Sequence, residues 1–283
     1  MNAVSHALTV DVEDWFQVLN LRGQIPRESW EDQTLRLEDP TRRFLDLFDK
    51  YEAKATFFCL GWIAERVPDL IQDILAGGHE LASHGYDHKL LPELGPDGFR
   101  EDLRKTNEIL QGISGGLPVE SFRACTWSVG PDTPWAFPTL VEEGFLYDSS
   151  VQPVRNPDYG DPSAPLGPHW LEPLEGQRLF ELPPLVGQVL GRRLPLGGGG
   201  YLRLLPVSWI SRGLRRREEA GQASCLYLHP WELDPDQPRV GVRGVRGFRH
   251  YVNLTKTARK LETLLSRHSF TTVKEVARVF GSS

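Results

Sequence analysis

The sequence predicts an α/β protein whose strands form a parallel sheet. Short apolar runs typical of buried strands alternate with segments whose apolar residues recur at helical spacing. At least three such strand–helix units follow one another in the first half of the chain. Repetition of that unit is typical of parallel βαβ structure.

The first strand is expected at residues 7–12 (ALTVDV), a β-branched run that ends in acidic residues. A helix is expected at residues 41–51, where apolar residues have helical spacing and polar residues lie opposite. Residues 64–75 read as helical but contain Pro68, which predicts two short helices. The other expected strands are residues 54–60, 80–83, 120–125 and 225–229, and the other expected helices are residues 99–113, 133–143, 207–220, 253–267 and 273–280.

Residues 152–206 differ from this pattern because Pro and Gly are dense there and periodicity is lost. Such a length is unusual for a simple connection in a compact domain, so we expect a functional insertion or lid. No internal repeat interrupts the chain, and we expect residues 1–283 to form one domain.

The composition is that of a globular enzyme, with 40% hydrophobic and 25% charged residues in a chain of 283. A net charge of −6 argues against a nucleic acid as partner, because such binding needs a basic face. Residues 212–217 (RGLRRR) are a local exception. A solvated helix face explains them most simply, and an anionic partner or a membrane surface is the alternative.

The sequence favours a cytoplasmic location, with association with a membrane as the alternative. The first residues, MNAVSHALTVDVEDW, lack the basic start and apolar run of a secretory signal. No apolar stretch reaches the roughly 18 residues that a transmembrane helix needs. Three cysteines are too few for a disulfide framework. The oligomeric state is not indicated.

The segment His84-Gly85-Tyr86-Asp87-His88 carries two histidines that could converge on one metal ion, whether on a helical turn or on a loop leading into one. Surface histidines are the simpler interpretation of such a pair. However, the pair follows an expected parallel strand, and active sites of parallel sheets gather at the carboxyl ends of strands.

Three carboxylates, Asp11, Glu13 and Asp14, crowd the end of the first expected strand. They repel one another unless a cation or a shared proton intervenes, although an acidic first turn of a helix is the alternative. Two imidazoles, one carboxylate and an open position for water form a standard catalytic zinc site. A further carboxylate could then act as general base.

Three more residues are candidates at strand ends. His229 ends an apolar strand and is suited to protonating a leaving amine, although it could be a core histidine. Arg123 could hold the base carboxylate ionised, or could form a surface ion pair. Asp148, after the run GFLY, could orient or tune a neighbouring residue.

Together these motifs resemble the NodB-homology polysaccharide deacetylases, carbohydrate esterase family four. The similar pieces are TVDVEDW at the first strand end, SHGYDH for the usual THxxH, Arg123-Ala124-Cys125 for the usual RxP, and LYLH around His229. The chain looks most like the branch with DVED or DVEE that includes exosortase-associated exopolysaccharide deacetylases. The resemblance runs from about residue 8 to residue 276.

The resemblance implies a distorted (β/α) barrel with fewer than eight units and a divalent metal held by one carboxylate and two histidines. The metal would be zinc, with cobalt or nickel as alternatives. Asp11 falls on the general base, His84 and His88 on the metal ligands, His229 on the general acid, and Arg123 on the arginine that tethers the base. The substrate would be an N-acetylated glycan.

The carboxylate ligand is left open because Val12 stands where the family's ligand usually follows the base. We favour Glu13, since residues i and i+2 of a strand face the same way, and Asp14 is the alternative. Cys125 stands in place of the usual proline, either as a small buried residue or as a thiol that reacts with the metal. The backbone N–H of Thr126 falls where the family binds the oxyanion.

Two alternatives to a deacetylase remain. One is an allantoinase-like hydrolase of small cyclic amides, which would favour a small closed pocket. The other is a non-catalytic sugar-binding protein, against which the retained carboxylates and histidines argue.

Overall fold

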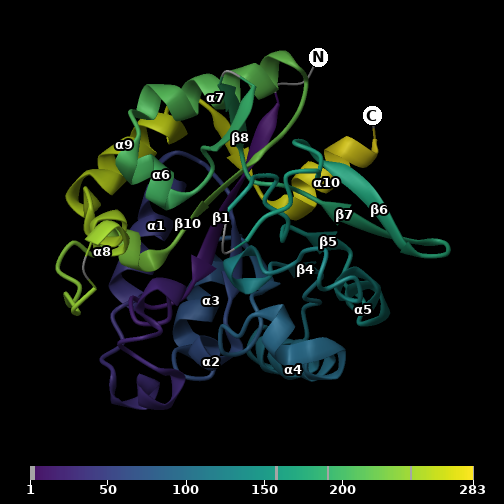
Figure 1. The fold of residues 1–283 in the computed structure, drawn as a ribbon, viewed down its shortest axis with the longest axis horizontal. Coiled ribbons are helices and arrows are strands. Elements are labelled where there is room, and N and C mark those ends of the chain that lie inside the picture. The colour runs from purple at the N-terminus through teal and green to yellow at the C-terminus, as the bar shows by residue number, and fades with distance from the viewer. Residues whose placement is uncertain (1–3, 157–158, 190, 243, 283) are drawn as a thin grey trace.

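A computed structural model of the chain describes residues 4–156, 159–189, 191–242 and 244–282. Its centre is a nine-stranded sheet in the order β10-β1-β2-β3-β4-β5-β7-β6, with β11 paired to β1. Every pairing in the sheet is parallel except β6 with β7. Figure 1 shows α7 and α9 on one side of β1, and α2, α3 and α4 grouped on another side.

The elements follow the expected alternation of strand and helix through the first half of the chain. The strands of the central sheet are β1 (Ser5–Val12), β2 (Thr56–Cys59), β3 (Glu80–Ser83), β4 (Ser121–Phe122), β5 (Tyr147–Asp148), β6 (His169–Leu174), β7 (Gln177–Glu181), β10 (Cys225–Leu228) and β11 (Ser269–Thr271). The helices are α1 (Glu38–Lys50), α2 (Gly61–Ala64), α3 (Pro68–Ala76), α4 (Leu91–Ile113), α5 (Ala136–Glu142), α6 (Gly199–Leu204), α7 (Val207–Glu219), α8 (Gly244–Tyr251), α9 (Thr257–Leu265) and α10 (Val273–Gly281). Pro68 begins α3 and separates it from α2, as predicted.

The sheet curls toward closure because the chain that leaves β7 returns to β10. Pro184 forms an isolated parallel bridge with Cys225, and Gly198 forms another with Tyr227. These bridges bring the far end of the sheet back to its first strand. The α/β fold is therefore a distorted barrel, which confirms the fold class expected from the sequence.

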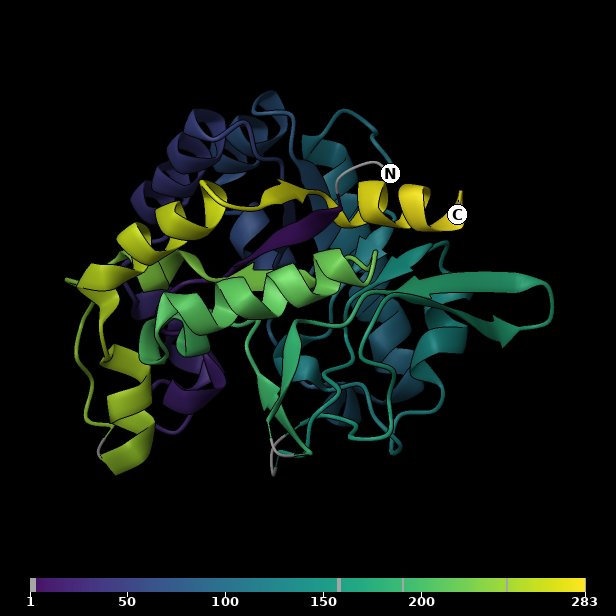
Figure 2. The same ribbon diagram turned by 90° about the horizontal axis from the view of Figure 1, so that it is seen from above.

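The two faces of β1 pack against different hydrophobic clusters, because side chains alternate along a strand. Leu8, Val10 and Val12 lie in the main hydrophobic cluster, whereas Ala7 belongs to a smaller one. That smaller cluster gathers inward-facing residues of several strands with one face of α10: Ala7, Phe58, Ala82, Phe180, Leu182, Cys225, Val273, Val276 and Ala277. Figure 2 shows α10 beside the start of β1. The barrel interior is thus apolar at its amino end, while the same face of β1 turns polar at Thr9 and Asp11 toward its carboxyl end.

Residues 152–206, where the sequence shows no periodicity, contain regular structure in their described part. This stretch contains β6 and β7, which extend the central sheet, and the two-stranded sheet of β8 (Val186–Val189) and β9 (Arg192–Pro195). Its high content of Pro and Gly hid these short strands. Whether the stretch acts as an insertion or lid stays a prediction.

No helix in the described ranges is both long enough and apolar enough to cross a lipid bilayer.

Candidate active site

The site lies at the carboxyl end of the sheet, where β1, β3, β4 and β10 deliver side chains to one cavity of about 210 Å³. Asp11, Glu13, His84, His88 and His229 all line that cavity. The structure therefore brings together residues that the sequence singled out on three separate segments.

Asp11 and Arg123 form a buried ion pair in the barrel interior. Arg123 donates to Asp11 Oδ1 at 2.6 Å and to Thr9 Oγ1 at 2.7 Å. Its other nitrogens donate to the backbone and hydroxyl oxygens of Ser149 at 3.1 and 2.9 Å, and its guanidinium stacks 4.2 Å from the ring centroid of Phe58. The arginine is fully buried, so the pair is not screened by water. This is the contact expected between Arg123 and the base carboxylate.

His84 is held in a defined tautomer by the backbone. Its Nδ1 lies 2.8 Å from the carbonyl oxygen of Arg123. A carbonyl can only accept, so Nδ1 carries the proton and Nε2 keeps a free lone pair. Burial lowers the pKa of His84 to about 4, which keeps the ring neutral. A neutral imidazole with a free Nε2 is the form that binds metals.

The turn between the two histidines depends on Gly85 and Asp102. Gly85 has a φ of +73°, and a Cβ there would meet Asp102 Oδ2 at 2.8 Å, so only glycine fits. Asp102 accepts the backbone N–H of Tyr86, which fixes the turn. His88 itself adopts a left-handed φ of +58°. The segment is a loop, and it brings the His84 and His88 rings to a centroid distance of 5.6 Å.

Glu13, not Asp14, is the carboxylate that faces the histidines. Glu13 Oε2 lies 2.8 Å from His88 Nε2, while Oε1 accepts from the indole N–H of Trp231 at 3.3 Å. Burial would raise the pKa of Glu13, but the His88 ring outweighs it and lowers the pKa to about 2. Oε2 is nevertheless buried with no hydrogen-bond donor among the described residues, because its approach to His88 lacks hydrogen-bond geometry.

Asp14 does not reach the site, which is a correction to its place as alternative metal ligand. It is turned away and accepts the backbone N–H groups of Arg36 at 2.6 Å, Leu37 at 3.2 Å and Trp15 at 2.7 Å. Burial raises its pKa to about 6. Its carboxylate fixes the chain that leads from the end of β1 at Val12 toward α1.

Asp148 does not line the cavity, and its role in orienting or tuning a neighbouring residue stays a prediction. It accepts two hydrogen bonds from Ser150, at 2.6 and 3.1 Å, and it lies opposite Glu181 in the register of β5 and β7. Burial raises the pKa of both carboxyl groups, most strongly that of Glu181, whose pKa is raised further by Asp148. Two buried carboxyl groups that lie opposite each other on neighbouring strands are expected to share a proton. The buried Arg123 guanidinium is close enough to Asp148 to oppose this rise in its pKa.

His229 follows β10 and leans over the two carboxylates. Its Nε2 lies 3.8 Å from Asp11 Oδ2 and 3.5 Å from Glu13 Oε1, and its Nδ1 lies 3.3 Å from Glu232 Oε2. Burial would lower the pKa of His229, but Glu232, Glu13 and Asp11 together raise it to about 9. The ring also stacks on Trp231, with centroids 5.0 Å apart.

Two charged residues behind His229 were missed from the sequence. Glu232 is fully buried and pairs with Arg203 at 2.9 Å, and Arg203 in turn donates to backbone carbonyls of α8. A Cβ on Gly199 would come within 1.7 Å of Glu232, so this glycine makes room for the carboxylate. The available signal was Glu232 itself, three residues after His229 at the start of a helical turn.

Cys125 lies beside the histidine pair. Its Sγ and the ring nitrogens of His84 and His88 lie within 4.8 Å of one another, and the thiol donates to the His84 carbonyl at 3.0 Å. Burial and the nearby Glu13 raise the pKa of this thiol well above its usual value. Thr126 and Trp127, which follow, have φ values of +53° and +56° and line the cavity. A left-handed turn of two non-glycine residues is strained, as is common at functional sites.

Comparison with known proteins divides the chain into two parts. Residues 29–134, which carry His84, His88 and Arg123, match the polysaccharide deacetylase family. Residues 149–278, which carry His229, match a domain of unknown function named DUF3473. Asp11 and Glu13 precede both matches.

The curated relatives match over short stretches. A peptidoglycan-N-acetylglucosamine deacetylase of Bacillus cereus is 37% identical over 78 residues, 28% of this chain and 28% of the relative. A chitooligosaccharide deacetylase of Rhizobium leguminosarum bv. trifolii is 29% identical over 83 residues, 29% of this chain and 39% of the relative. The match thus covers well under half the length of either relative.

Solved structures share the fold along the whole chain. A Mycobacterium smegmatis protein assigned to the polysaccharide deacetylases covers 100% of this chain and 92% of its own, at 20% identity and a TM-score of 0.62. The match with the Puue allantoinase covers 99% of this chain and 90% of the allantoinase, at 18% identity and a TM-score of 0.62. A carbohydrate esterase family four pseudoenzyme from Bacillus anthracis covers 97% and 66%, at 13% identity and a TM-score of 0.51. At such identities these likenesses concern the fold alone. The match of residues 29–134 and the deacetylases among the relatives make this part of the chain similar to the polysaccharide deacetylase family.

Proposed function

We propose that the protein is a metal-dependent hydrolase that removes acetyl groups from N-acetylated sugar units of a glycan. The observation that carries this proposal is the convergence of Asp11, Glu13, His84, His88 and His229 in one cavity at the carboxyl end of the sheet. A sugar-binding protein without catalysis would have no use for a buried arginine that holds a carboxylate beside a buried, neutral histidine, His84.

The residues present fit a divalent metal, most simply zinc, with cobalt or nickel as alternatives. Glu13 Oε2 is a buried anionic oxygen without a donor, and His84 offers a free Nε2. With His88 they make the one-carboxylate, two-histidine set of a catalytic site that keeps an open position. When bound, such a metal polarises a carbonyl and lowers the pKa of water.

Asp11 is placed to act as general base. Its Oδ1 is occupied by Arg123, so Oδ2 faces the cavity and is free to accept a proton from the attacking water. Arg123 holds that carboxylate in one orientation throughout the reaction. The water oxygen forms a bond to the acetamide carbonyl carbon, and the backbone N–H of Thr126 stabilises the negative oxygen that develops.

His229 is placed to act as general acid. Glu232 accepts from Nδ1, which leaves Nε2 as the nitrogen that faces the cavity and donates a proton. That proton goes to the sugar nitrogen as the carbon–nitrogen bond breaks, so that acetate and an amine are released. Trp127 and Trp231 line the same cavity and offer aromatic faces for a sugar ring.

A direct test presents the zinc-loaded protein with N-acetylglucosamine oligomers and, separately, with allantoin. Release of acetate from the oligomers without turnover of allantoin supports the proposal. Turnover of allantoin alone would transfer the assignment to the small cyclic amides. Binding of oligomers without release of acetate would make the chain a sugar-binding protein.

A further inference from the structure

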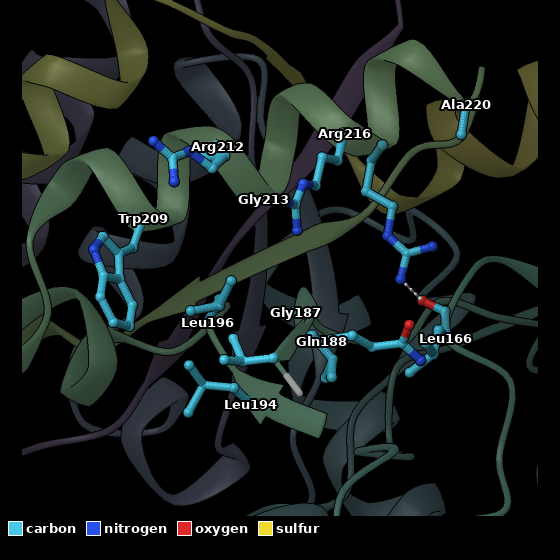
Figure 3. Close-up of a pocket in the computed structure, with 13 residues that line it drawn as sticks. Leu166, Gly187, Gln188, Leu194, Leu196, Trp209, Arg212, Gly213, Arg216 and Ala220 are labelled. Carbon is cyan, nitrogen blue, oxygen red and sulfur yellow. Dashed lines mark hydrogen bonds between the residues drawn. The ribbon is translucent and has the colours of Figure 1, made fainter. Parts of the chain in front are cut away.

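A second hollow lies outside the active-site cavity, between α7 and the β8–β9 hairpin. This groove has a volume of about 480 Å³, which is within the range of small-molecule sites. Its floor includes Val186, Leu194 and Leu196, and Trp209 stands at one end. Figure 3 shows α7 above these residues, with the side chain of Arg216 directed toward the hairpin. The groove and the active-site cavity share no lining residue.

One face of α7 supplies the wall of this groove. Trp209, Arg212, Gly213, Arg216 and Arg217 recur three or four residues apart and all line it, whereas Ile210 and Leu214 point into the core. Gly213 lets α7 pack close to the hairpin, because a Cβ at this position would meet Leu196 at 3.0 Å. Three of the four arginines in the run noticed in the sequence, Arg212, Arg216 and Arg217, line the groove, and the side chains of Arg212 and Arg216 are also exposed to solvent.

The positive charge of the groove has no counter-charge within it. No Asp or Glu lines it, and Arg212 and Arg216 form no ion pair among the described residues. Arg217 is half-buried and donates only to neutral oxygens, the Leu166 carbonyl and Gln222 Oε1, both at 2.9 Å. Burial lowers the pKa of Arg217, which is the cost of a guanidinium without a carboxylate.

The apolar part of the groove suits a hydrocarbon chain better than a peptide. Trp209 and Val189 are 47% and 49% exposed, which is unusual for large apolar side chains next to a hollow. A peptide would bring backbone N–H groups that need acceptors, yet the lining offers mainly donors and aliphatic carbon. An alkyl chain requires no hydrogen bonds, and a phosphate head would satisfy adjacent guanidinium groups.

We propose that this groove binds an anionic lipid, with its alkyl chain along Val186, Leu194 and Leu196 and its phosphate head against Arg212 and Arg216. The floor excludes water from the chain, and the two arginines, one helical turn apart on the same face, bracket the head. This proposal does not rest on the deacetylase activity, because none of its residues belongs to the active site.

The test is calorimetric titration of the full chain with dodecyl phosphate below its micelle concentration. Two control ligands are titrated in the same way: inorganic phosphate, which has the phosphate group without an alkyl chain, and dodecyl maltoside, which has the alkyl chain on an uncharged head. The wild type is expected to bind dodecyl phosphate at least about tenfold more tightly than either probe, because only dodecyl phosphate uses the charged hydrogen bonds and the apolar floor together. Equal binding of inorganic phosphate, or no binding of dodecyl phosphate, would overturn the proposal.

Charge reversal on α7 supplies the matched comparison. The double variant Arg212→Glu with Arg216→Glu is expected to lose at least about tenfold in affinity for dodecyl phosphate. Arg215→Glu is the control, because Arg215 is exposed on the same helix but does not line the groove. An equal loss in the control would mean that only general electrostatic attraction operates. Leu194→Asp, which places a carboxylate on the floor, must weaken binding as well, and unchanged thermal unfolding midpoints show that each variant is folded.

Discussion

Replacement of Arg123 by methionine tests whether the ion pair with Asp11 is as isolated from water as its geometry indicates. Methionine keeps much of the apolar stem, but it removes every hydrogen bond that the guanidinium makes to Asp11, Thr9 and Ser149. It leaves Asp11, which is 4% exposed, as a buried carboxylate without its cation. Removal of one partner of a buried pair costs about 3–5 kcal/mol, so we expect a loss of that size in the free energy of unfolding.

Urea denaturation of chelator-treated protein measures this loss without interference from a bound metal. Asp11→Asn alone should also destabilise, because it leaves the guanidinium unpaired. The double variant should lose less than the sum of the two single losses, by about 1–3 kcal/mol, since neither charge is then stranded. Arg104→Met is the control: Arg104 pairs with Glu143 at the surface, where about 0–1 kcal/mol is expected. A loss below about 1 kcal/mol for Arg123→Met, or strict additivity in the double variant, would refute the reasoning.

Three further predictions follow from the same geometry. Glu13→Gln should weaken zinc binding, measured by calorimetry, at least about 100-fold, whereas Asp14→Asn should leave it within a few-fold; the reverse order would restore Asp14 as the ligand. Burial lowers the pKa of His6 to about 4 in the folded protein. As the pH falls below the ordinary pKa of histidine, His6 therefore takes up a proton in the unfolded chain but stays neutral in the folded chain. Between about pH 7 and pH 5 the wild type should therefore lose roughly 2 kcal/mol of stability that His6→Gln does not lose, and equal pH dependence in urea melts would contradict this. The pKa of Glu181 is raised well above its usual value, so the folded state keeps a proton on this carboxyl that the unfolded chain releases as pH rises. Glu181→Gln should therefore be more stable than the wild type at about pH 8. A less stable variant would show that the Glu181 carboxylate is ionised in the folded protein.

The sequence predicted the parts of the site that follow from local pattern. Asp11, His84, Arg123 and His229 each end or follow a strand, and parallel strands bring their carboxyl ends to one edge. The choice of Glu13 over Asp14 also followed from strand alternation, which the position of Val12 on the opposite face supports.

The parts that could not be predicted depend on contacts between distant segments. Asp148 looked like a strand-end acid, but its carboxylate accepts from Ser150 and lies opposite Glu181 across the sheet, 33 residues later. Glu232 is paired with Arg203, on a helix that the sequence did not indicate. Almost no position of β6, β8 or β9 is fully buried, so these strands lacked the apolar signal that marked β1 and β2.

The central claim is that a metal site and the Asp11 base act together in deacetylation. Its most direct test is the release of acetate from N-acetylglucosamine oligomers by chelator-treated protein, by zinc-restored protein and by the Asp11→Asn variant loaded with zinc. We predict release only by the zinc-restored wild type, with the variant slower by at least about 100-fold while it still binds zinc. Equal release by the chelator-treated protein, or by the variant, would contradict the claim.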